Sequence, residues 1–291
     1  MTIRPLHTID EFRQVLELEK LIWGYEDSDD AVGIPVFVIT VKRGGILLGA
    51  FDGDRMVGFV YSLAGLKRGT PMQWSHMLGV VDGYRATGVG RDLKLEQRRI
   101  AVEMGLDLME WTYNPLVAVN AHLNFNRLGV LVEDYVLNVY GDSSSPLHRG
   151  TPTDRFIAQW WMRSPRVTEL LGSADAPLAT RALKPSRFAT GHAATALLDV
   201  PLVNAVADNG TWLACTGVDL ACEADELAVA IPAGFNEMLE AEPGLGHDWR
   251  MASRQLFGHY LNGGYRVTGF SFGPGGREGR YRLARREQGP A

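Results

Sequence analysis

Residues 74 to 90 decide the fold, and they read Trp74-Ser75-His76-Met77-Leu78-Gly79-Val80-Val81-Asp82-Gly83-Tyr84-Arg85-Ala86-Thr87-Gly88-Val89-Gly90. An apolar strand ends at Asp82-Gly83, a short loop with two glycines follows, and the next run, up to Gly105, is typical of a helix. Glycine lets the backbone approach a bulky ligand closely. The first amides of a helix lack intrahelical partners and lie at the positive end of its dipole. The stretch therefore predicts a cradle for phosphate or pyrophosphate, to which Arg85 can add a charged contact.

The spacing of this loop differs from the two commonest phosphate loops. Gly90 is followed by Arg91-Asp92, whereas a Walker loop ends in Gly-Lys-Ser/Thr, and Leu93 occupies the place of the third glycine of a dinucleotide fingerprint. A tight turn that binds no ligand is the structural alternative. The pattern Arg85-x-x-Gly88-x-Gly90 after an apolar strand resembles the acyl-coenzyme A signature of the GNAT acyltransferases.

Length and composition set bounds on the fold and the partners. The chain has 291 residues, which is comfortable for two domains, and its apolar fraction of 46% is ordinary for a globular protein. A net charge of −5 without a long basic block argues against nucleic acid as the main partner. No run approaches the roughly 18 apolar residues that span a membrane, and the N-terminus lacks the apolar core of a signal peptide. We therefore expect a cytoplasmic protein without a membrane partner.

Cysteine and histidine do not form a metal-binding pattern. Cys215 and Cys222 are the only cysteines, and a reducing compartment makes a disulfide between them unexpected. His247, Asp248 and His259 lack the tight spacing of metal ligands. We expect no metal.

The N-terminal half has a clear order of elements. Thr8-Ile9-Asp10-Glu11 is a capping box that predicts a helix over 9 to 22, after a short strand at 3 to 6. Residues 23 to 35 are expected to be a loop or a broken second helix. Strands are expected at 46 to 51 and 55 to 63 around an Asp-Gly turn, and then at 74 to 81, 106 to 113, 130 to 140 and 154 to 162. Helices are expected at 92 to 104 and 117 to 128. This order is similar to that of the GNAT core.

The C-terminal part changes in composition. Residues 164 to 192 are rich in Ala, Ser, Pro, Thr and Arg and are expected to be a linker with a short helix at 167 to 171. Strands are expected at 196 to 206, 211 to 221 and 226 to 231, then a helix from Asp248 and two final strands. The fold class is therefore α+β: a GNAT domain over 1 to 163 with a mostly antiparallel, splayed sheet, and a smaller α+β domain over 193 to 291. This half resembles the extension of a two-domain bacterial GNAT subgroup and is interpreted as a degenerate half-copy of the fold.

The GNAT resemblance implies where acetyl-CoA or another acyl-CoA binds. In such proteins the strand at 76 to 81 separates from the strand at 106 to 113, and the pantetheine arm enters between them. Backbone groups of Leu78 and Val80 would pair with that arm. The pyrophosphate would lie on the loop and helix start, at Arg85, Ala86, Thr87, Gly88, Val89, Gly90 and Arg91. The later helix would add Asn120, Asn124 and Phe125, although a solvated helix face is the alternative for the two asparagines.

Catalysis is less clearly indicated. The amide of Leu78 is the candidate group that polarises the thioester carbonyl. His76 has an unperturbed pKa that suits a general base, and Glu110 on the facing strand is a second candidate; a strand histidine and a surface carboxylate are the alternatives. GNAT proteins often carry a Tyr that acts as general acid for the departing thiolate, and this chain has Phe125 at the matching position. The tyrosines that could replace it are Tyr113, Tyr135 and Tyr140.

The resemblance predicts a CoA-dependent N-acyltransferase. It would move an acetyl or succinyl group to the amine of a small molecule such as an amino acid, by direct attack in a ternary complex. Arg127 or Arg155 could hold a second carboxylate. The alternatives are a CoA-binding module that has lost its chemistry and an acetyltransferase of protein N-termini. A homodimer is expected because proteins of the GNAT family are often homodimers.

Overall fold

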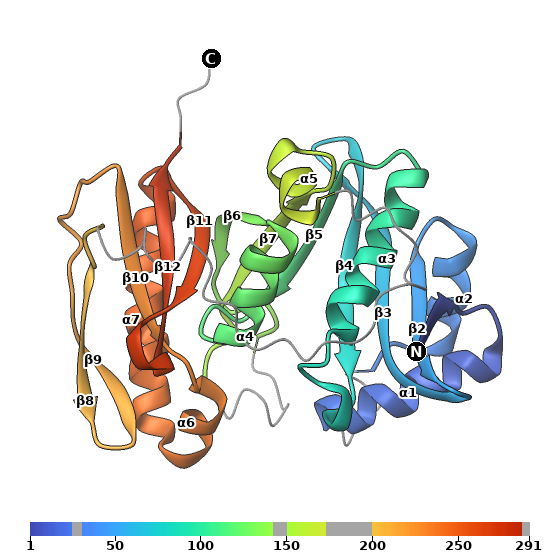
Figure 1. The fold of residues 1–291 in the computed structure, drawn as a ribbon, viewed down its shortest axis with the longest axis horizontal. Helices are drawn as coiled ribbons and strands as arrows, with labels where there is room; N and C mark the ends of the chain where they lie inside the picture. The colour runs from blue at the N-terminus through green and yellow to red at the C-terminus, as the bar shows by residue number, and fades with distance from the viewer. Residues whose placement is uncertain (25–30, 142–149, 173–199, 287–291) are drawn as a thin grey trace. The chain divides into compact units, whose positions relative to one another are not determined.

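The computed structural model describes residues 1–24, 31–141, 150–172 and 200–286, and these residues form two compact units (Figure 1). Unit 1 contains the described residues of Met1–Trp111 and Trp160–Phe188, and unit 2 contains those of Thr112–Gln159 and Ala189–Ala291. The chain therefore enters unit 2 inside one expected domain and returns to unit 1 before the linker. The domain boundaries at 163 and 193 stay a prediction, because spatial compactness and a family's sequence boundary are different criteria.

The sheet of unit 1 has the strand order β1-β2-β3-β4-β5. Its first four strands are antiparallel neighbours, whereas β4 and β5 are parallel. Their bounds are Thr2–Pro5 for β1, Ile46–Asp52 for β2, Arg55–Lys67 for β3, Thr70–Val80 for β4 and Leu108–Tyr113 for β5. The turn between β2 and β3 has Gly53 at φ 60°, which confirms the turn that the Asp-Gly pair predicts.

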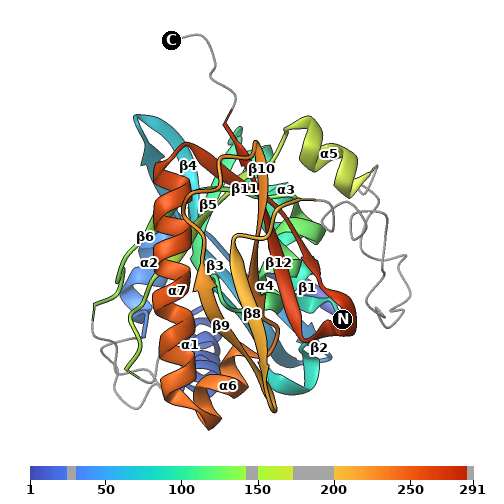
Figure 2. The ribbon, with the colours of Figure 1, turned by 90° about the vertical axis from the view of Figure 1, so that its left-hand side faces the viewer.

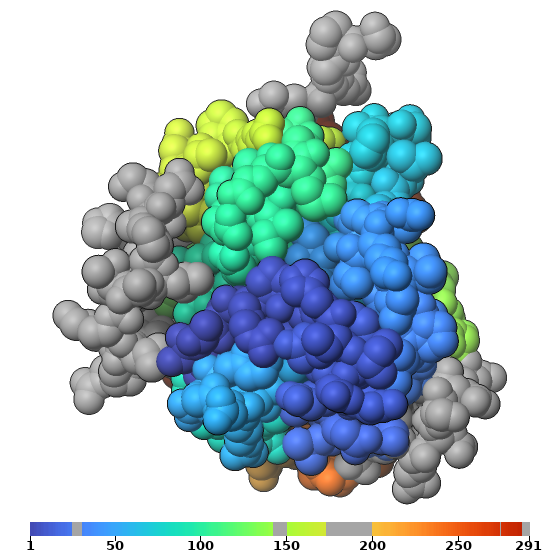
Figure 3. Space-filling model, turned by 90° about the vertical axis from the view of Figure 1, so that its right-hand side faces the viewer, coloured from blue at the N-terminus to red at the C-terminus, as the bar shows by residue number. Residues whose placement is uncertain are grey.

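Helices cover both faces of this sheet. On one face lie α1 (Ile9–Trp23) and α2 (Ile34–Lys42), and a side chain at Gly79 of β4 would point at Ile22 and Trp23 of α1. On the other face lies α3 (Val89–Glu103), which packs Gly90 near Leu78 of the same strand. Neighbouring strand residues point to opposite faces, so α1 and α3 lie on opposite sides of β4. Figure 3 shows the surface that β1, α1 and α2 form on unit 1, with α3 adjoining in green.

A buried lysine ties α3 to the sheet. The Lys94 ammonium donates to Ser75 Oγ at 2.7 Å and lies 3.7 Å from the centroid of the Trp111 ring. Its side chain is 2% exposed, and burial lowers the pKa of Lys94 well below its usual value. The contact joins β4 and β5 on the face that α3 covers, because Ser75 belongs to β4 and Trp111 to β5.

Unit 2 is built around a second set of antiparallel strands in the order β7-β6-β11-β12-β10. Their bounds are Leu131–Val136 for β6, Arg155–Trp161 for β7, Glu226–Pro232 for β10, Tyr265–Phe272 for β11 and Glu278–Arg285 for β12. A separate hairpin pairs β8 (Asn204–Asn209) with β9 (Trp212–Val218). Strand β12 lies between β10 and β11, although it follows both in the chain.

One long helix organises the core of unit 2. Helix α7 (Pro243–Asn262) packs against β9, β11 and β6, and Figure 2 shows it running along the strands, with the short α6 (Phe235–Ala241) before it. Its Phe257 contacts Phe156 with ring centroids 4.6 Å apart, and both rings contact Tyr281. The aromatic side chains of β7, β12 and α7 thus share a single core.

Most expected elements are present, with shifted ends. Strand β6 ends at Val136 rather than at 140, because Asn138 takes a left-handed φ of 46° and turns the chain. Helix α7 begins at Pro243, five residues before the expected start at Asp248. The short helix in the expected linker is α5, Pro165–Leu171. Residues 173 to 192 of that linker and 196 to 199 of an expected strand lie outside the described residues.

Two expectations about helices need correction. Helix α2 was not expected as such, because its sequence Ile34-Pro35-Val36-Phe37-Val38-Ile39-Thr40-Val41-Lys42 is rich in β-branched residues that favour strands. The expected helix over 117 to 128 is α-helical only at Ala118–Ala121, and His122–Leu128 is a π-helix. Among the described helices, none is long and apolar enough to cross a membrane.

The packing of α1 on β4 can be tested at Gly79. A Cβ there would lie 2.8 Å from Ile22 Cδ1 and 2.9 Å from Trp23, so we expect Gly79→Ala to lower the free energy of unfolding by about 1–3 kcal/mol. Gly83→Ala is the control, because a Cβ at Gly83 meets nothing within 4 Å. Urea denaturation of both variants measures the difference, and equal stability would show that α1 does not pack as described.

Candidate active site

Strand β4 leaves β5 at a β-bulge. The two strands pair at Gln73 with Met109 and at Trp74 with Glu110, and β4 then runs on to Val80 without another β5 partner among the described residues. In the ladder with β3, Tyr61 faces Met77 and the next residue, Ser62, faces Ser75. His76 is therefore the extra residue of a bulge, and a bulge bends and twists its strand. The separation of β4 from β5 begins at this residue.

The separated edge of β4 presents main-chain groups. The amide of Val81 donates to the Val57 carbonyl of β3 at 3.0 Å. Hydrogen-bonded and non-hydrogen-bonded pairs alternate along an antiparallel ladder, so the main-chain groups of Leu78 and Val80 point away from β3. That direction is the side on which β4 has parted from β5.

The loop after β4 opens onto the start of α3. Residues Asp82–Tyr84 form one 3-10 turn, and Ala86 and Gly88 then adopt left-handed φ angles of 60° and 103°. Gly88 is the N-cap of α3, and no side chain among the described residues caps this helix. Helix α1 differs, since Thr8 and Glu11 form a complete capping box there. The first turn of α3 is thus left open to an anion.

Arg85 lies beside this loop but is engaged. Its Nε donates to the Val80 carbonyl at 3.1 Å, and its Nη1 forms an ion pair with Asp82 at 2.6 Å. Both side chains are more than half exposed, and an ion pair of this kind contributes only about 0–1 kcal/mol. A phosphate at the loop can therefore compete for the guanidinium.

A group of polar side chains faces β4 from the side of α1 and α2. Tyr61 of β3 shares a 2.7 Å hydrogen bond with Thr40 of α2, and its ring lies edge-on to His76 with centroids 6.0 Å apart. Glu19 of α1 is fully buried and accepts the Val32 amide at 3.0 Å through Oε2. Its Oε1 has no hydrogen-bond partner in the described part of the chain.

Burial shifts the pKa values of these groups in different directions. Burial raises the pKa of Glu19 to about 7, and the negative charge of Glu19 also helps to raise the pKa of Tyr61. The His76 side chain has one exposed side, while the protein packed around its other sides lowers the pKa of His76 by desolvation. His76 is therefore neutral, and able to accept a proton, at pH 7.

Glu19 was missed by the sequence analysis, although the sequence carried a signal for it. It lies in line with Phe12, Val15 and Ile22 at helical spacing, on the apolar stripe of α1. A carboxylate inside an apolar stripe is rarely buried without a function or a partner.

Glu110 is less suited to proton transfer in this arrangement. It is 5% exposed and forms an ion pair with Lys67 of β3, at the last point where β4 and β5 pair. The ion pair holds the carboxylate at the base of the separation between the strands. Its role as a base stays a prediction.

The helical segment expected to contact coenzyme belongs to unit 2. Asn120 is exposed, whereas Asn124 is 3% exposed on the π-helix. The two asparagines, expected to share one helix face, therefore do not lie on the same exposed surface. Phe125 is buried against Tyr281, with ring centroids 5.8 Å apart. Their contacts with coenzyme stay predictions.

The tyrosines considered as acids are all in unit 2. Tyr113 is buried, and burial raises its pKa well above the usual value. Tyr135 donates to Asp154 at 2.9 Å, and Tyr140 shares a 2.7 Å hydrogen bond with Thr112. In the described residues, no group of His, Cys, Asp and Glu side chains is placed to hold a metal ion.

Comparisons with known proteins concern the fold alone. No family model and no curated protein matches the sequence. Among solved structures, an aminoglycoside 6'-acetyltransferase type Ii is 16% identical and covers 56% of this chain and 99% of its own, with a TM-score of 0.44. The ribosomal-protein-S18-alanine N-acetyltransferase from Escherichia coli is 15% identical and covers 54% and 91%, also with a TM-score of 0.44. A putative acetyltransferase from Salmonella typhimurium with acetyl-CoA is 18% identical and covers 56% and 95%, with a TM-score of 0.44.

The order of elements from β1 to β7, with parallel β4 and β5 that part at a bulge and an open loop before α3, is the order expected for GNAT acyltransferases. The chain contains a GNAT fold.

The charge state of Glu19 predicts a pH-dependent stability. The folded pKa of about 7 lies above the unfolded value of 4.5, so the stability from the protonated group is complete below pH 4.5 and falls as pH rises to 7. We expect Glu19→Gln to remove this loss and to exceed the wild type by about 3 kcal/mol at pH 8. Denaturation at pH 4.5 to 8 measures the gap.

The exposed Glu17 of the same helix provides the control for this prediction. Its side chain is 75% exposed, so Glu17→Gln should leave the pH dependence of stability as in the wild type. A Glu19→Gln curve parallel to that of the wild type would contradict the raised pKa.

Proposed function

We propose that the chain is an N-acyltransferase that uses acetyl-CoA or another acyl-CoA as cosubstrate. The single observation that carries the proposal is the uncapped start of α3, opened by the left-handed Gly88, directly after the free edge of β4. A loop of this form supplies amides and a helix dipole to a pyrophosphate. The strand edge supplies main-chain partners for the amide-bearing arm of coenzyme A.

In this proposal the main chain of β4 orients and activates the thioester. The amide of Leu78 would donate to the thioester carbonyl and stabilise the negative charge that develops on its oxygen. The amide of Val80 would hold the pantetheine arm, and its carbonyl would do so once Arg85, which donates to it in the structure, turns to the phosphate. The amides of Val89 and Gly90 would hold the pyrophosphate together with Arg85, Ala86, Thr87 and Arg91. Bound acyl-CoA supplies the activated acyl group.

His76 is the proposed general base. It lies on the bulge from which the strands part, with one side exposed, and its lowered pKa keeps it neutral. It would take the proton that the amine loses as its nitrogen forms the new bond to the carbonyl carbon. The carbon–sulfur bond then breaks, and the thiolate receives a proton in turn. Glu19, with its unpartnered Oε1, is the second candidate for the base, acting through water.

The acceptor is proposed to be the amine of a small molecule such as an amino acid. The apolar and aromatic residues of α1, α2 and β3 around Tyr61 form the wall next to His76, and Phe37 contacts that tyrosine at 5.0 Å between centroids. An acetyltransferase of protein N-termini and a CoA-binding module without activity remain the alternatives, and both acetyl and succinyl donors are to be tested.

The remaining organisation is also proposed rather than tested. We propose a GNAT domain over 1 to 163, a linker over 164 to 192 and a half-copy of the fold over 193 to 291. The strand, helix, strand and strand of residues 226 to 285 repeat the chain order of residues 108 to 161, which supports the half-copy. A cytoplasmic location and a homodimer stay predictions.

Coenzyme binding is expected to depend on the open turn of α3. A carboxylate at Gly90 would repel the pyrophosphate while its Cβ meets only ordinary contacts at 3.8 Å, so Gly90→Asp should weaken CoA binding about tenfold or more. Gly244→Asp is the charge-matched control, because Gly244 is exposed, has no positive φ and leaves open space for a Cβ. Calorimetric titration with acetyl-CoA and succinyl-CoA measures both, and wild-type protein that binds neither coenzyme would refute the proposal.

The pH dependence of acyl transfer should identify the base. With His76 as base, kcat/KM rises with pH through a pKa below 6.5, and His76→Ala lowers kcat by about 10²–10⁴. With Glu19 as base, the rise is instead centred near pH 7 and disappears in Glu19→Gln. Thiol release over a panel of amines gives the rates, and turnover without either dependence would exclude both residues.

A further inference from the structure

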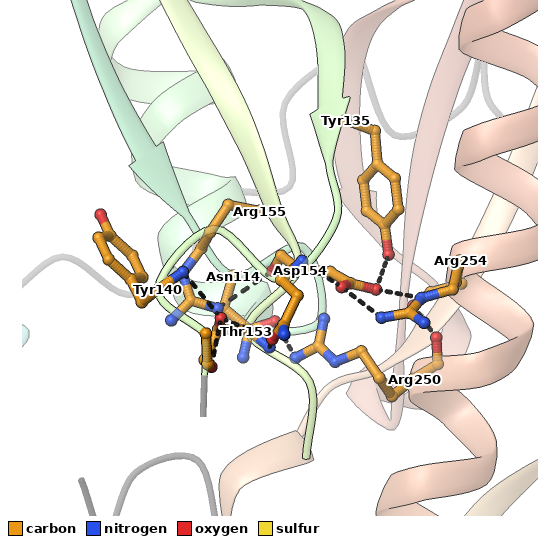
Figure 4. A network of polar contacts seen from close by, with 11 residues as sticks. Asn114, Tyr135, Tyr140, Thr153, Asp154, Arg155, Arg250 and Arg254 are labelled. Carbon is orange, nitrogen blue, oxygen red and sulfur yellow. Dashed lines mark hydrogen bonds and ion pairs between the residues drawn. The ribbon is translucent and has the colours of Figure 1, made fainter. Parts of the chain in front are cut away.

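Unit 2 contains a buried cluster of arginines with one carboxylate among them. Arg250 and Arg254 lie one turn apart on α7, and Arg155 begins β7 (Figure 4). Arg250 is 1% exposed and Arg155 is 8% exposed. Asp154 is completely buried beside them. The Arg250 guanidinium therefore lies in the interior of this unit, with Arg155 and the Arg254–Asp154 ion pair beside it.

The single carboxylate is already fully used. Asp154 Oδ1 accepts from Arg254 Nη2 at 2.7 Å and from the Asn138 amide at 2.9 Å. Its Oδ2 accepts from Arg254 Nε at 2.8 Å and from the Tyr135 hydroxyl at 2.9 Å. Arg254 is thereby paired in a two-pronged ion pair, and Asp154 has no lone pair left for Arg250.

Arg250 feels the charge of Asp154, but no ion pair joins the two among the described residues, and Arg250 keeps donors without an acceptor. Its Nη2 donates to Asn114 Oδ1 at 2.8 Å, while its buried Nε and Nη1 have no acceptor in the described part of the chain. Burial lowers the pKa of Arg250, and both burial and the charge of Arg250 lower the pKa of Arg155 to about 10. An uncompensated buried guanidinium destabilises a fold, so its presence calls for an occupant.

The remaining neighbours of Arg250 offer no charge. The ring of Phe235 from α6 lies 5.5 Å from its guanidinium carbon, and Asn114 is neutral and also accepts the Leu116 amide. Thr153, between Asn138 and Asp154, is completely buried and bonded to Asn138. A small oxyanion would accept from the orphan donors of Arg250 and balance its buried charge.

We propose that Arg250 and the adjoining Arg155 form an anion-binding site in unit 2, distinct from the phosphate loop of unit 1, that takes the carboxylate or phosphate group of a small molecule. Guanidinium groups suit both oxyanions because their planar forks donate to two oxygens at once. The site has the electrostatic features of one that binds an anionic effector or an anionic part of a substrate.

The test uses the full chain without coenzyme, at constant ionic strength set with sodium chloride. We expect sodium phosphate or sodium succinate to raise the melting temperature saturably, and the two salts separate a phosphate ligand from a carboxylate ligand. The response should persist in Gly90→Asp, in which the loop of unit 1 is blocked. A response that Gly90→Asp abolishes would assign the anion to that loop and overturn the proposal.

Variants of Arg250 give the decisive comparison. Arg250→Met should weaken the anion response about tenfold or more, yet leave the melting temperature in chloride unchanged or higher, because an apolar side chain replaces an uncompensated buried charge. Arg250→Lys should retain part of the response. Arg285→Met removes an exposed arginine of the same unit and should retain all of it.

Two results would overturn the proposal. One is a wild type that shows no saturable response to either anion. The other is an Arg250→Met variant that melts below the wild type in chloride and still responds to anions as the wild type does, since Arg250 would then be a structural residue. A Gly90→Asp protein that no longer binds coenzyme but still responds to phosphate would show that the anion site does not depend on the proposed coenzyme site.

Discussion

The parting of β4 from β5 is the constraint on which the rest of unit 1 depends. Two parallel strands that pair at Trp74 and Glu110 would ordinarily continue to pair, since each further residue adds hydrogen bonds. The bulge at His76 prevents this by twisting β4 away. Lys94 holds the two strands together just before the bulge, because it contacts Ser75 on one strand and Trp111 on the other. The cost is a row of unpaired main-chain groups along β4.

Those unpaired groups and the start of α3 form one continuous polar path. The main chain of Leu78 and Val80 points to the open side, and the chain then turns through the left-handed Gly88 directly into a helix that carries no cap. The same chain gives α1 a complete capping box. Helices α2, α5, α6 and α7 also lack a side-chain cap, so what distinguishes α3 is the left-handed Gly88 that places its first turn directly after the free edge of β4.

The sequence was sufficient for features that depend on local chemistry. The capping box at Thr8, the Asp-Gly turn and the glycines at 88 and 90 each impose a backbone geometry on their neighbours, and each appears where expected. The bulge at His76 and the π-helix after His122 were not foreseen, because they follow from register and packing between distant segments.

The environment of individual side chains could not be predicted from the sequence for a similar reason. Helix α2 shows this at the level of an element, since β-branched residues favour strands until packing decides otherwise. The site shows it at the level of a side chain. His76 was identified by type, but its lowered pKa comes from the residues around it. The hydrogen-bond partner of Arg250 is Asn114, which lies 136 residues earlier in the chain.

Buried charges in this protein fall into two classes, and the difference separates structure from function. Asp154 is compensated by four donors, whereas Lys94 has a hydroxyl and an indole ring as partners and burial lowers its pKa. Glu19 and Arg250 each have atoms without a partner among the described residues. A fold selected for stability alone would replace such a group with an apolar residue of similar size. We infer that the chain retains Glu19 in unit 1 and Arg250 in unit 2 because each serves a proton or a ligand.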